Sequence, residues 1–260
     1  MLTETERLIM NRLRGQILQM SAHAGEGHVP SSLSILDLLY VIYSKFMPAQ
    51  ASIGKESNRF ILSKGHAALG LYVVLAEMGY FPKDWLGTFG EFESNLGGHP
   101  DSRKIPGVEA STGSLGHGLP IAVGIALGKK INRENSRVFA LVGDGEMNEG
   151  AIWESLLLAS HHQLGNLTVV IDANNSTNRA LTLGNLVDKF SSFGWEAVEI
   201  NGHEHQEIQA SLSSYSANTP TAVIARTVKG FGIKDMEENP AWHHASPNTE
   251  QLAVFLKDLE

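Results

Sequence analysis

Polar and glycine residues follow two apolar segments of this chain, at positions where a ligand could bind. One segment is followed by Gly143-Asp144-Gly145 and another, about thirty residues later, by Asn174-Asn175. If both segments are parallel strands joined by a crossover helix, the carboxylate and the first amide lie at neighbouring carboxyl ends, where open α/β sheets bind ligands. Carboxylate and amide oxygens are ligands that Mg²⁺ and Ca²⁺ prefer. A lone Gly-Asp-Gly is more often a turn, but the second polar strand end favours a cation site that carries a phosphate.

Glycine and histidine are both frequent, and several histidines adjoin glycines. The chain has 26 glycines and 11 histidines in 260 residues, whereas a glycine content near ~7% is usual. Glycine lets the backbone approach a ligand closely, and imidazole can bind a ligand or transfer a proton near neutral pH. A single histidine is more often a surface or core residue than a ligand. We therefore assign no role to five histidines outside the glycine-containing segments: His23, His161, His162, His203 and His205.

Short apolar segments alternate with amphipathic ones along the chain. Those rich in Val and Ile are typical of buried parallel strands and span 59–62, 137–142, 167–171, 195–200 and 221–228. Those with the apolar spacing of helices span 3–22, 33–45, 67–78, 119–130, 152–162, 185–193, 205–214 and 249–259. The alternation predicts right-handed βαβ units and an α/β fold with a doubly wound, mainly parallel sheet flanked by helices.

Local signals indicate where the first helices begin. Thr3 and Glu6 have the spacing of a capping box. We expect the second helix to begin after Ser31 or Ser32, because serine is a favoured N-cap. Residues 79–118 are rich in glycine and proline and weakly periodic, which favours a functional loop. No linker is visible, so we expect residues 1–260 to form one domain.

Composition excludes several classes of protein. The formal net charge is −8 and the pI is near 5.8, which argues against the clustered basic face of a nucleic-acid-binding protein. The chain has no cysteine, which excludes disulfides and thiolate metal sites. No apolar run approaches the ~18–20 residues of a membrane span, and the first residues lack the apolar core of a secretory signal. We expect no membrane or nucleic-acid partner and a cytoplasmic location.

The order of the polar motifs resembles the amino-terminal, diphosphate-binding domain of the transketolase family. The Gly-Asp-Gly and Asn-Asn pair resembles the thiamine-diphosphate motif. The resemblance covers about residues 5–250, and the further motifs that carry it are Gly27-His28, Ser63-Lys64-Gly65-His66-Ala67, Gly97-Gly98-His99-Pro100, Gly113-Ser114-Leu115-Gly116 and Trp242-His243. Six motifs in the family's order are far more specific than any one of them.

The resemblance implies roles for individual residues. Asp144, the side-chain oxygen of Asn174 and the backbone carbonyl of Ser176 would bind Mg²⁺, for which Ca²⁺ is a possible substitute. The residues that would contact thiamine diphosphate are Lys64, His66, Leu115, Gly116, Gly145, Asn174, Lys229 and His243. Those implied to act on the sugar and in proton transfer are His28, His66, His99 and His243. Gly145 would donate its N–H to the diphosphate, the Gly116 carbonyl would accept from the pyrimidine amino group, and Glu149 matches an acid at the family's dimer interface.

Three positions depart from the family's pattern. Val29-Pro30 follows His28 where Pro-Gly is common, His117 follows Gly116 in place of Gln or Glu, and His244 replaces the glycine after the Trp-His pair. The first two lie close to where the sugar would bind. The donor could therefore be a modified ketose rather than an ordinary pentose phosphate.

The resemblance also implies a partner chain. The glutamate that activates the cofactor belongs to a pyrimidine-binding domain, which residues 1–260 do not contain, and we expect this and the C-terminal domain on a second subunit in a heterotetramer. The implied function is transfer of a two-carbon ketol unit from a ketose or ketose phosphate to an aldose. Two alternatives stay open: a non-catalytic assembly subunit, and a carboligase such as a 1-deoxyxylulose-5-phosphate-synthase-like enzyme. A nicotinamide dehydrogenase is weaker, because residues 113–118 do not spell the G-x-G-x-x-G fingerprint.

Overall fold

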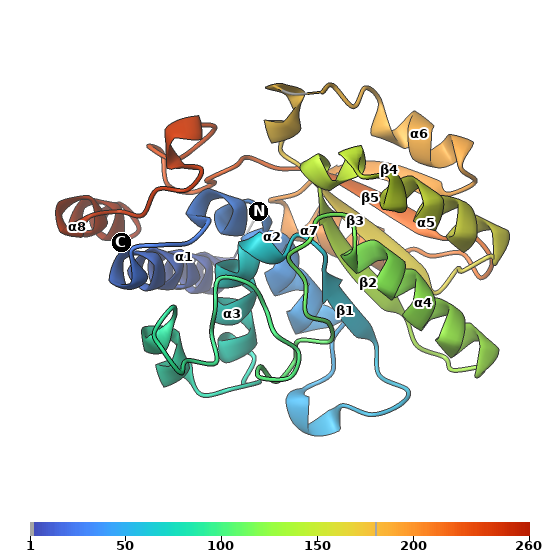
Figure 1. The fold of residues 1–260 in the computed structure, drawn as a ribbon, viewed down its shortest axis with the longest axis horizontal. Helices are drawn as coiled ribbons and strands as arrows, with labels where there is room; N and C mark the ends of the chain where they lie inside the picture. Colours follow the sequence, from blue (N-terminus) through green and yellow to red (C-terminus); the bar gives the residue numbers. More distant parts are fainter. Residues whose placement is uncertain (1–2, 180) are drawn as a thin grey trace.

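The computed structural model describes residues 3–179 and 181–260 and contains one parallel five-stranded sheet in the order β1-β2-β3-β5-β4 (Figure 1). The strands are β1 (Arg59–Leu62), β2 (Val138–Gly143), β3 (Leu167–Ala173), β4 (Glu196–Asn201) and β5 (Thr221–Arg226). Every residue of β2 and β3 is buried, as expected for central strands of a sheet covered on both faces. The predicted α/β fold with a doubly wound parallel sheet is confirmed.

Helices cover both faces of this sheet (Figure 1). The helices are α1 (Glu4–Ala24), α2 (Val29–Lys45), α3 (Ala68–Glu77), α4 (Gly118–Ile131), α5 (Gly150–His161), α6 (Leu186–Ser192), α7 (His205–Ser213) and α8 (Thr249–Asp258). One apolar core joins the sheet to α1, α2, α3 and α7, with α8 packed on α1, and the other joins it to α4, α5 and α6. The two cores fix the sheet, so the loops at its carboxyl ends have a rigid base.

The beginnings of α1 and α2 differ in how well the sequence predicts them. Thr3 accepts from the Glu6 backbone N–H and the Glu6 side chain accepts in return, which is the predicted capping box. The prediction for α2 was wrong: the helix begins at Val29, with His28 as the N-cap residue and no side-chain cap. Pro30 explains the earlier start, because its fixed φ suits the first turn of a helix. Both serines proposed as caps are buried inside this helix.

The loops at the carboxyl ends differ in length from those predicted. Strands β2 and β3 extend to Gly143 and Ala173, so Asp144 directly follows β2. Strand β5 ends at Arg226 rather than 228, which leaves Lys229 in the loop after it. The loop is anchored to α2, since the Gly230 N–H donates to the Pro30 carbonyl at 3.0 Å.

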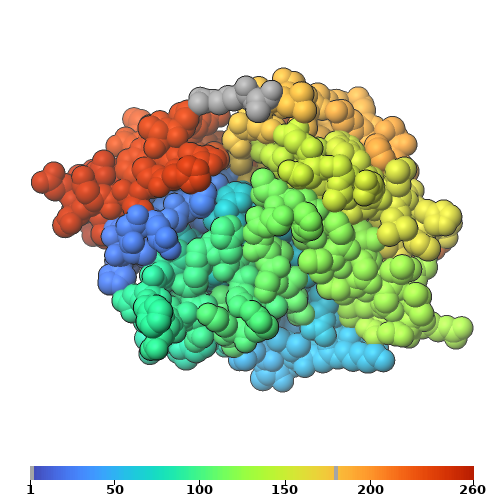
Figure 2. Space-filling model, in the orientation of Figure 1, coloured from blue at the N-terminus to red at the C-terminus, as the bar shows by residue number. Residues whose placement is uncertain are grey.

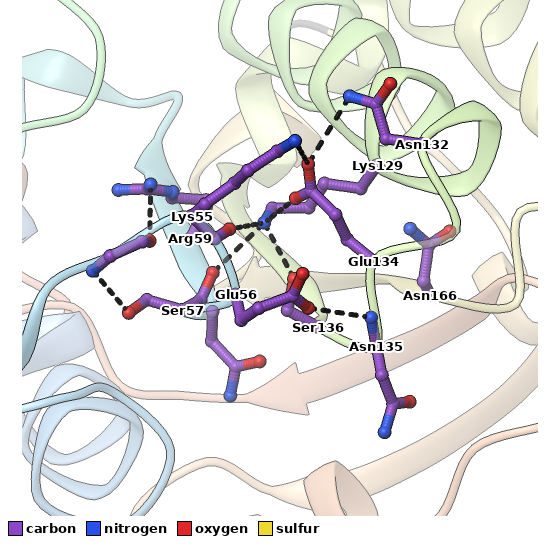
Figure 3. Close-up of polar contacts among 12 residues, drawn as sticks. Lys55, Glu56, Ser57, Arg59, Lys129, Asn132, Glu134, Asn135, Ser136 and Asn166 are labelled. Carbon is purple, nitrogen blue, oxygen red and sulfur yellow. Dashed lines mark hydrogen bonds and ion pairs between the residues drawn. The ribbon is translucent and has the colours of Figure 1, made fainter.

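The amino ends of β1 and β2 are joined by Lys129, near the end of α4 (Figure 3). Its ammonium donates to the carbonyls of Lys55 and Ser57, both at 3.1 Å, to Glu134 at 2.9 Å and to the Ser136 hydroxyl at 2.7 Å. Since Ser57 and Ser136 lie just before the two strands, one buried cation joins three segments at this end of the sheet.

The two edge strands of the sheet differ: β1 is short, and β4 is largely exposed. Strand β1 has only four residues, and most positions of β4 are exposed, including Glu196, Val198 and Glu199.

In the described parts of the chain, no helix is both long and apolar enough to span a bilayer.

Candidate functional site

Asp144 and Asn174 lie at the carboxyl ends of adjacent strands. The register pairs Gly143 of β2 with Asp172 of β3. Ser176 connects the two, because its hydroxyl donates to Asp144 Oδ1 at 3.3 Å and its N–H donates to Asn174 Oδ1 at 3.0 Å. The structure therefore brings together the three residues predicted to bind a metal.

One oxygen of Asp144 has a feature that points to a cation. Its Oδ2 is buried and has no hydrogen-bond partner within residues 3–179 and 181–260, although an unpaired buried carboxylate oxygen is costly. Burial, followed by the charge of nearby Asp172, raises the pKa of Asp144. A divalent cation bound to this oxygen would pair with it and offset the cost of burying the carboxylate. The residues present therefore fit the Mg²⁺ that the resemblance implies.

Asp172 organises the base of the site, although no role was predicted for it from the sequence. It is fully buried and accepts from Lys64 Nζ at 2.5 Å, from Ser34 at 2.5 Å and from Thr227. It also accepts from the Asn174 amide nitrogen at 2.9 Å, which turns the oxygen of that amide away from it. A charged residue at the end of an otherwise apolar strand was the signal that could have identified Asp172.

Lys64 lies behind the cleft rather than in its wall. The residue is 2% exposed, and its ammonium contacts Asp172 and the Ser31 carbonyl. The charge and hydrogen bond of Lys64 hold the pKa of Asp172 below its usual value despite burial, which acts to raise it. The positive charge of Lys64 is thus within electrostatic reach of the site but is paired with a carboxylate.

Glu146 is a second buried acid that sequence reasoning missed. It accepts from the Ser63 hydroxyl at 2.6 Å and from the backbone N–H groups of Gly116 and Gly143, both at 2.9 Å. Burial raises the pKa of Glu146, against the effect of these three donors. The carboxyl group ties the loops after β1 and β2 to the loop that carries Gly116.

The predicted pyrimidine loop is tightly packed at Gly116. This residue has φ of +78°, and a Cβ there would lie 2.6 Å from Cβ of Glu149, so only glycine fits without movement. Leu115 beside it is 37% exposed. Its side chain is partly open to solvent next to the loop, as a residue that contacts a ligand or another chain would be.

A cleft of about 500 Å³ opens beside the metal-site residues. It is lined by Gly145 and residues 174–177 on one side, and by Lys229, residues 238–240 and His243 on the other. In the space-filling view, the red C-terminal segment, cyan residues and yellow-green residues meet near the middle of this face (Figure 2). The volume and the polar side chains in the lining suit a small phosphorylated ligand.

The predicted histidines gather beside this cleft. The ring of His28 lies 5.2 Å from that of His66 and 5.9 Å from that of His243, measured between centroids. His99 packs against Gly113, where an added Cβ would lie 2.9 Å from its ring. All four come from different segments of the chain. His244 joins them, with its ring 4.5 Å from His28 and 4.4 Å from His243.

Burial lowers the pKa of three of these imidazoles, those of His28, His66 and His243. Burial, and then His244 and His243, lower the pKa of His28 to about 4. Burial and then Lys64 lower the pKa of His66 to about 2. Lys229 lies 2.9 Å from Nδ1 of His243, and burial with the charge of Lys64 lowers the pKa of Lys229 to about 8. At neutral pH, His28 and His66 can therefore each accept one hydrogen bond and donate another.

Two histidines that were given no role are structural. His203 and His205 contact the two oxygens of buried Asp37 at 3.0 and 2.9 Å, and Arg14 adds an ion pair at 3.2 Å. Burial raises the pKa of Asp37, but these partners together hold it at about 2. A hollow of about 800 Å³ borders this group; it is larger than the cleft, yet its buried carboxylate is fully paired.

Sequence comparison identifies the family. Residues 5–258 match the family model described as transketolase, thiamine diphosphate binding domain. The chain therefore belongs to the transketolase family and contains its thiamine-diphosphate-binding domain.

Two similar proteins are each named as one subunit of an apulose-4-phosphate transketolase. That of Actinobacillus succinogenes is 38% identical over 252 residues, which are 94% of this chain and 91% of the relative. That of Phocaeicola vulgatus is 35% identical over 268 residues, covering 100% of this chain and 95% of the relative. The transketolase of Pongo abelii is 37% identical over 241 residues, but the match spans only 38% of it.

Solved structures agree with this assignment. The transketolase from Campylobacter jejuni superimposes with a TM-score of 0.91 at 28% identity, covering 100% of this chain and 43% of that one. The transketolase from Leishmania mexicana gives 0.88 at 25% identity, covering 97% and 41%. The resemblance stated from the motifs is confirmed.

Proposed function

We propose that this chain is the cofactor-binding subunit of a thiamine-diphosphate- and Mg²⁺-dependent transketolase, a transferase that moves a two-carbon ketol unit from a ketose to an aldose. The observation that carries the proposal is the buried Oδ2 of Asp144, which accepts no hydrogen bond from any described residue, beside a cleft lined by polar side chains. Membership of the family and the names of the two apulose-4-phosphate transketolase relatives support it.

The metal-binding residues hold the ion, and the residues of the cleft bind the diphosphate. Asp144, the Asn174 side-chain oxygen and the Ser176 carbonyl hold Mg²⁺, whose charge anchors the diphosphate. Gly145 donates its N–H to that diphosphate, and the cationic Lys229 offsets part of its charge. Lys64 lies behind the cleft and contributes positive charge, although its ammonium is paired with Asp172. When bound, thiamine diphosphate supplies the nucleophilic carbon and the electron sink.

The histidines act on the sugar. His28, His66, His99 and His243 hydrogen-bond the donor hydroxyls and move protons as the carbon–carbon bond breaks. The lowered pKa values of His28 and His66 suit this role, because a neutral imidazole can both accept and donate. The names of the two relatives, which specify a phosphorylated ketose, favour a ketose phosphate as the donor.

A partner chain completes the site. We propose that residues 1–260 form one domain, and that the pyrimidine-binding and C-terminal domains belong to a second polypeptide. Gly116 and Leu115 then face the pyrimidine ring, and Glu149 lies at the interface. Two copies of each chain fit the preference of oligomers for closed symmetry. The two relatives are of similar length to this chain and are each named as one subunit, which supports a two-chain enzyme.

The test begins with the cofactor and ends with the partner. Calorimetric titration of the chain with thiamine diphosphate should show binding in Mg²⁺ and none in EDTA. Ketol transfer from a ketose phosphate to an aldose should appear only when the pyrimidine-domain chain that copurifies with it from the source cells is added. Equal turnover by this chain alone would contradict the two-chain proposal, and the absence of cofactor binding would contradict the whole.

The same assay separates the other candidate functions. A reconstituted enzyme that uses pyruvate with an aldehyde acceptor, and no ketose, would be a 1-deoxyxylulose-5-phosphate-synthase-like carboligase. A chain that pairs with its partner but binds no cofactor would serve in assembly alone. The buried oxygen of Asp144, which accepts no hydrogen bond from the described residues, disfavours that last possibility.

A further inference from the structure

Three imidazoles from two distant segments meet at the edge of the cleft. His28 precedes α2, whereas His243 and His244 follow the short helix Pro240–Trp242. One nitrogen from each of the three rings lies within 4.8 Å of the nitrogens of the other two. No other group of three potential ligand side chains of this kind is found in the part of the chain that the structure describes.

We propose that His28, His243 and His244 form a binding site for a transition-metal ion such as Zn²⁺, with three imidazole ligands and a fourth position open to the cleft. Imidazole nitrogens suit zinc and other late transition metals, whereas Mg²⁺ requires oxygen ligands. The site is thus chemically distinct from the one at Asp144.

The geometry is close to that of a bound ion. Nitrogens around a tetrahedral Zn²⁺, at about 2.0–2.1 Å from the metal, lie about 3.4 Å from one another. Closing the triangle from its present limit of 4.8 Å needs movements of about an ångström. His243 and His244 are exposed, so their rings have room to turn. His28 is half-buried and would be the fixed ligand.

One charge beside the cluster competes with a metal ion for a ligand. Lys229 opposes metal binding, because its ammonium lies 2.9 Å from Nδ1 of His243 and repels a second cation. The structure therefore contains both the ligands and a competitor for one of them.

His244 separates this site from the proposed function. It has no assigned part in binding the sugar, the cofactor or Mg²⁺, so its removal tests the metal site alone. Zinc binding at these imidazoles requires neither thiamine diphosphate nor a partner chain. Because the two proposals share His28 and His243, zinc binding is measured without sugar or cofactor, and its failure leaves the proposed function standing.

The experiment is a zinc titration of the full chain without thiamine diphosphate, in competition with a chromogenic zinc indicator. We expect one Zn²⁺ per chain, unaffected by excess Mg²⁺. His244→Gly should lower the affinity by at least about 10-fold, since loss of an outer-shell partner alone costs about 10–100-fold. Lys229→Met should raise it. Co²⁺ in place of Zn²⁺ should give the intense visible absorption of a tetrahedral ion in the wild type, and a weaker one in His244→Gly.

The matched control is the adjacent histidine pair on α5 and just after it, whose ring centroids are 5.0 Å apart. His161→Ala with His162→Ala removes two imidazoles away from the cluster and should leave zinc affinity unchanged. Circular dichroism verifies that each variant is folded. Equal affinity in the wild type and His244→Gly, loss of binding in the control pair, or displacement of zinc by Mg²⁺ would each overturn the proposal.

Discussion

Two buried lysines lie at opposite ends of the same sheet and have different surroundings. Lys129, at the amino ends of β1 and β2, donates to four acceptors drawn from the adjoining segments (Figure 3). Lys64, at the carboxyl ends, has one close carboxylate partner, Asp172, and a weaker contact to a carbonyl at 3.3 Å. Beside that pair is Asp144, with a buried oxygen that accepts no hydrogen bond from the described residues.

The difference shows how the fold divides stability from function. At the amino end, the buried cation is surrounded by matching acceptors, so nothing remains for a ligand to complete. At the carboxyl end, three buried acids, Asp144, Glu146 and Asp172, accompany one buried ammonium, that of Lys64, which leaves negative charge unbalanced. Such an arrangement lowers stability unless a cation binds. Variants at the two ends should therefore separate unfolding from ligand binding.

The largest effect is expected for Lys64→Met. The change leaves Asp172 as an unpaired buried carboxylate, and removal of one partner of a buried ion pair costs about 3–5 kcal/mol. Urea unfolding measures the loss. The double variant Lys64→Met with Asp172→Asn should recover part of it, because the orphaned charge is gone. A single variant as stable as the wild type would contradict the importance of this pair.

Asp144→Asn should affect binding and stability in opposite directions. Affinity for thiamine diphosphate in Mg²⁺ should fall by at least about 10-fold, because even outer-shell changes cost about 10–100-fold in metal affinity. The free energy of unfolding without metal should stay equal or increase, since a desolvated charge is removed. Calorimetry and urea unfolding measure the two. Asp101→Asn, in the loop between α3 and α4, is the matched control for cofactor affinity and should leave it unchanged. Loss of stability in the metal-free Asp144 variant would show that this carboxylate is structural.

Lys129→Met should lower stability and leave cofactor affinity unchanged, which is the reverse of Asp144→Asn. Four acceptors lose their donor, which costs roughly 1–2 kcal/mol because three of these hydrogen bonds are only partly buried and their acceptors can take water. Cofactor affinity should be unchanged, as the residue lies at the far end of the sheet. Lys130→Met, on the exposed face of the same helix, is the control. A drop in cofactor affinity with Lys129→Met would break the separation between the two ends.

The smallest effect is a difference in pH dependence. The pKa of Asp144 is raised in the folded protein, so its protonated form is favoured by folding. The stability that this protonation contributes is fully present below the unfolded value of 3.8 and is lost as the pH rises through the raised folded pKa. Metal-free wild type should therefore lose stability relative to Asp144→Asn across that interval. Mg²⁺ should abolish this difference in stability near neutral pH. A difference in stability that instead grows towards low pH would contradict the raised pKa of Asp144.

Sequence patterns predicted the sheet well, because buried parallel strands and amphipathic helices are local signals. Strand β1 has the predicted ends, and the other strands differ from their predicted ends by one or two residues. The start of α2 was missed, since a proline in the first turn outweighed a serine that could cap. Asp144, Asn174 and Ser176 were predicted as a group, and they lie together.

What could not be predicted depends on contacts between distant segments. Asp172 and Glu146 were visible in the sequence, but their donors come from 138 and 83 residues away, at Ser34 and Ser63. Similarly, the pairing of Lys64 with Asp172 rather than with the cleft depends on the order of the strands. The proximity of His244 to His28 requires the C-terminal segment to return to the beginning of α2, which no local pattern reveals.

The outermost strand has a consequence for self-association. A strand at the end of a sheet presents free N–H and carbonyl groups that can pair with another copy and begin aggregation. Strand β4 carries Glu196 and Glu199 on exposed positions, so two copies meeting there would bring carboxylates of like sign together. Glu199 is partly neutralised by Arg226 at 2.7 Å, which leaves Glu196 to supply most of the repulsion. The exposed acidic side chains of β4 therefore discourage edge-to-edge association of copies into fibres. The cleft at the carboxyl ends of the strands stays accessible to small molecules.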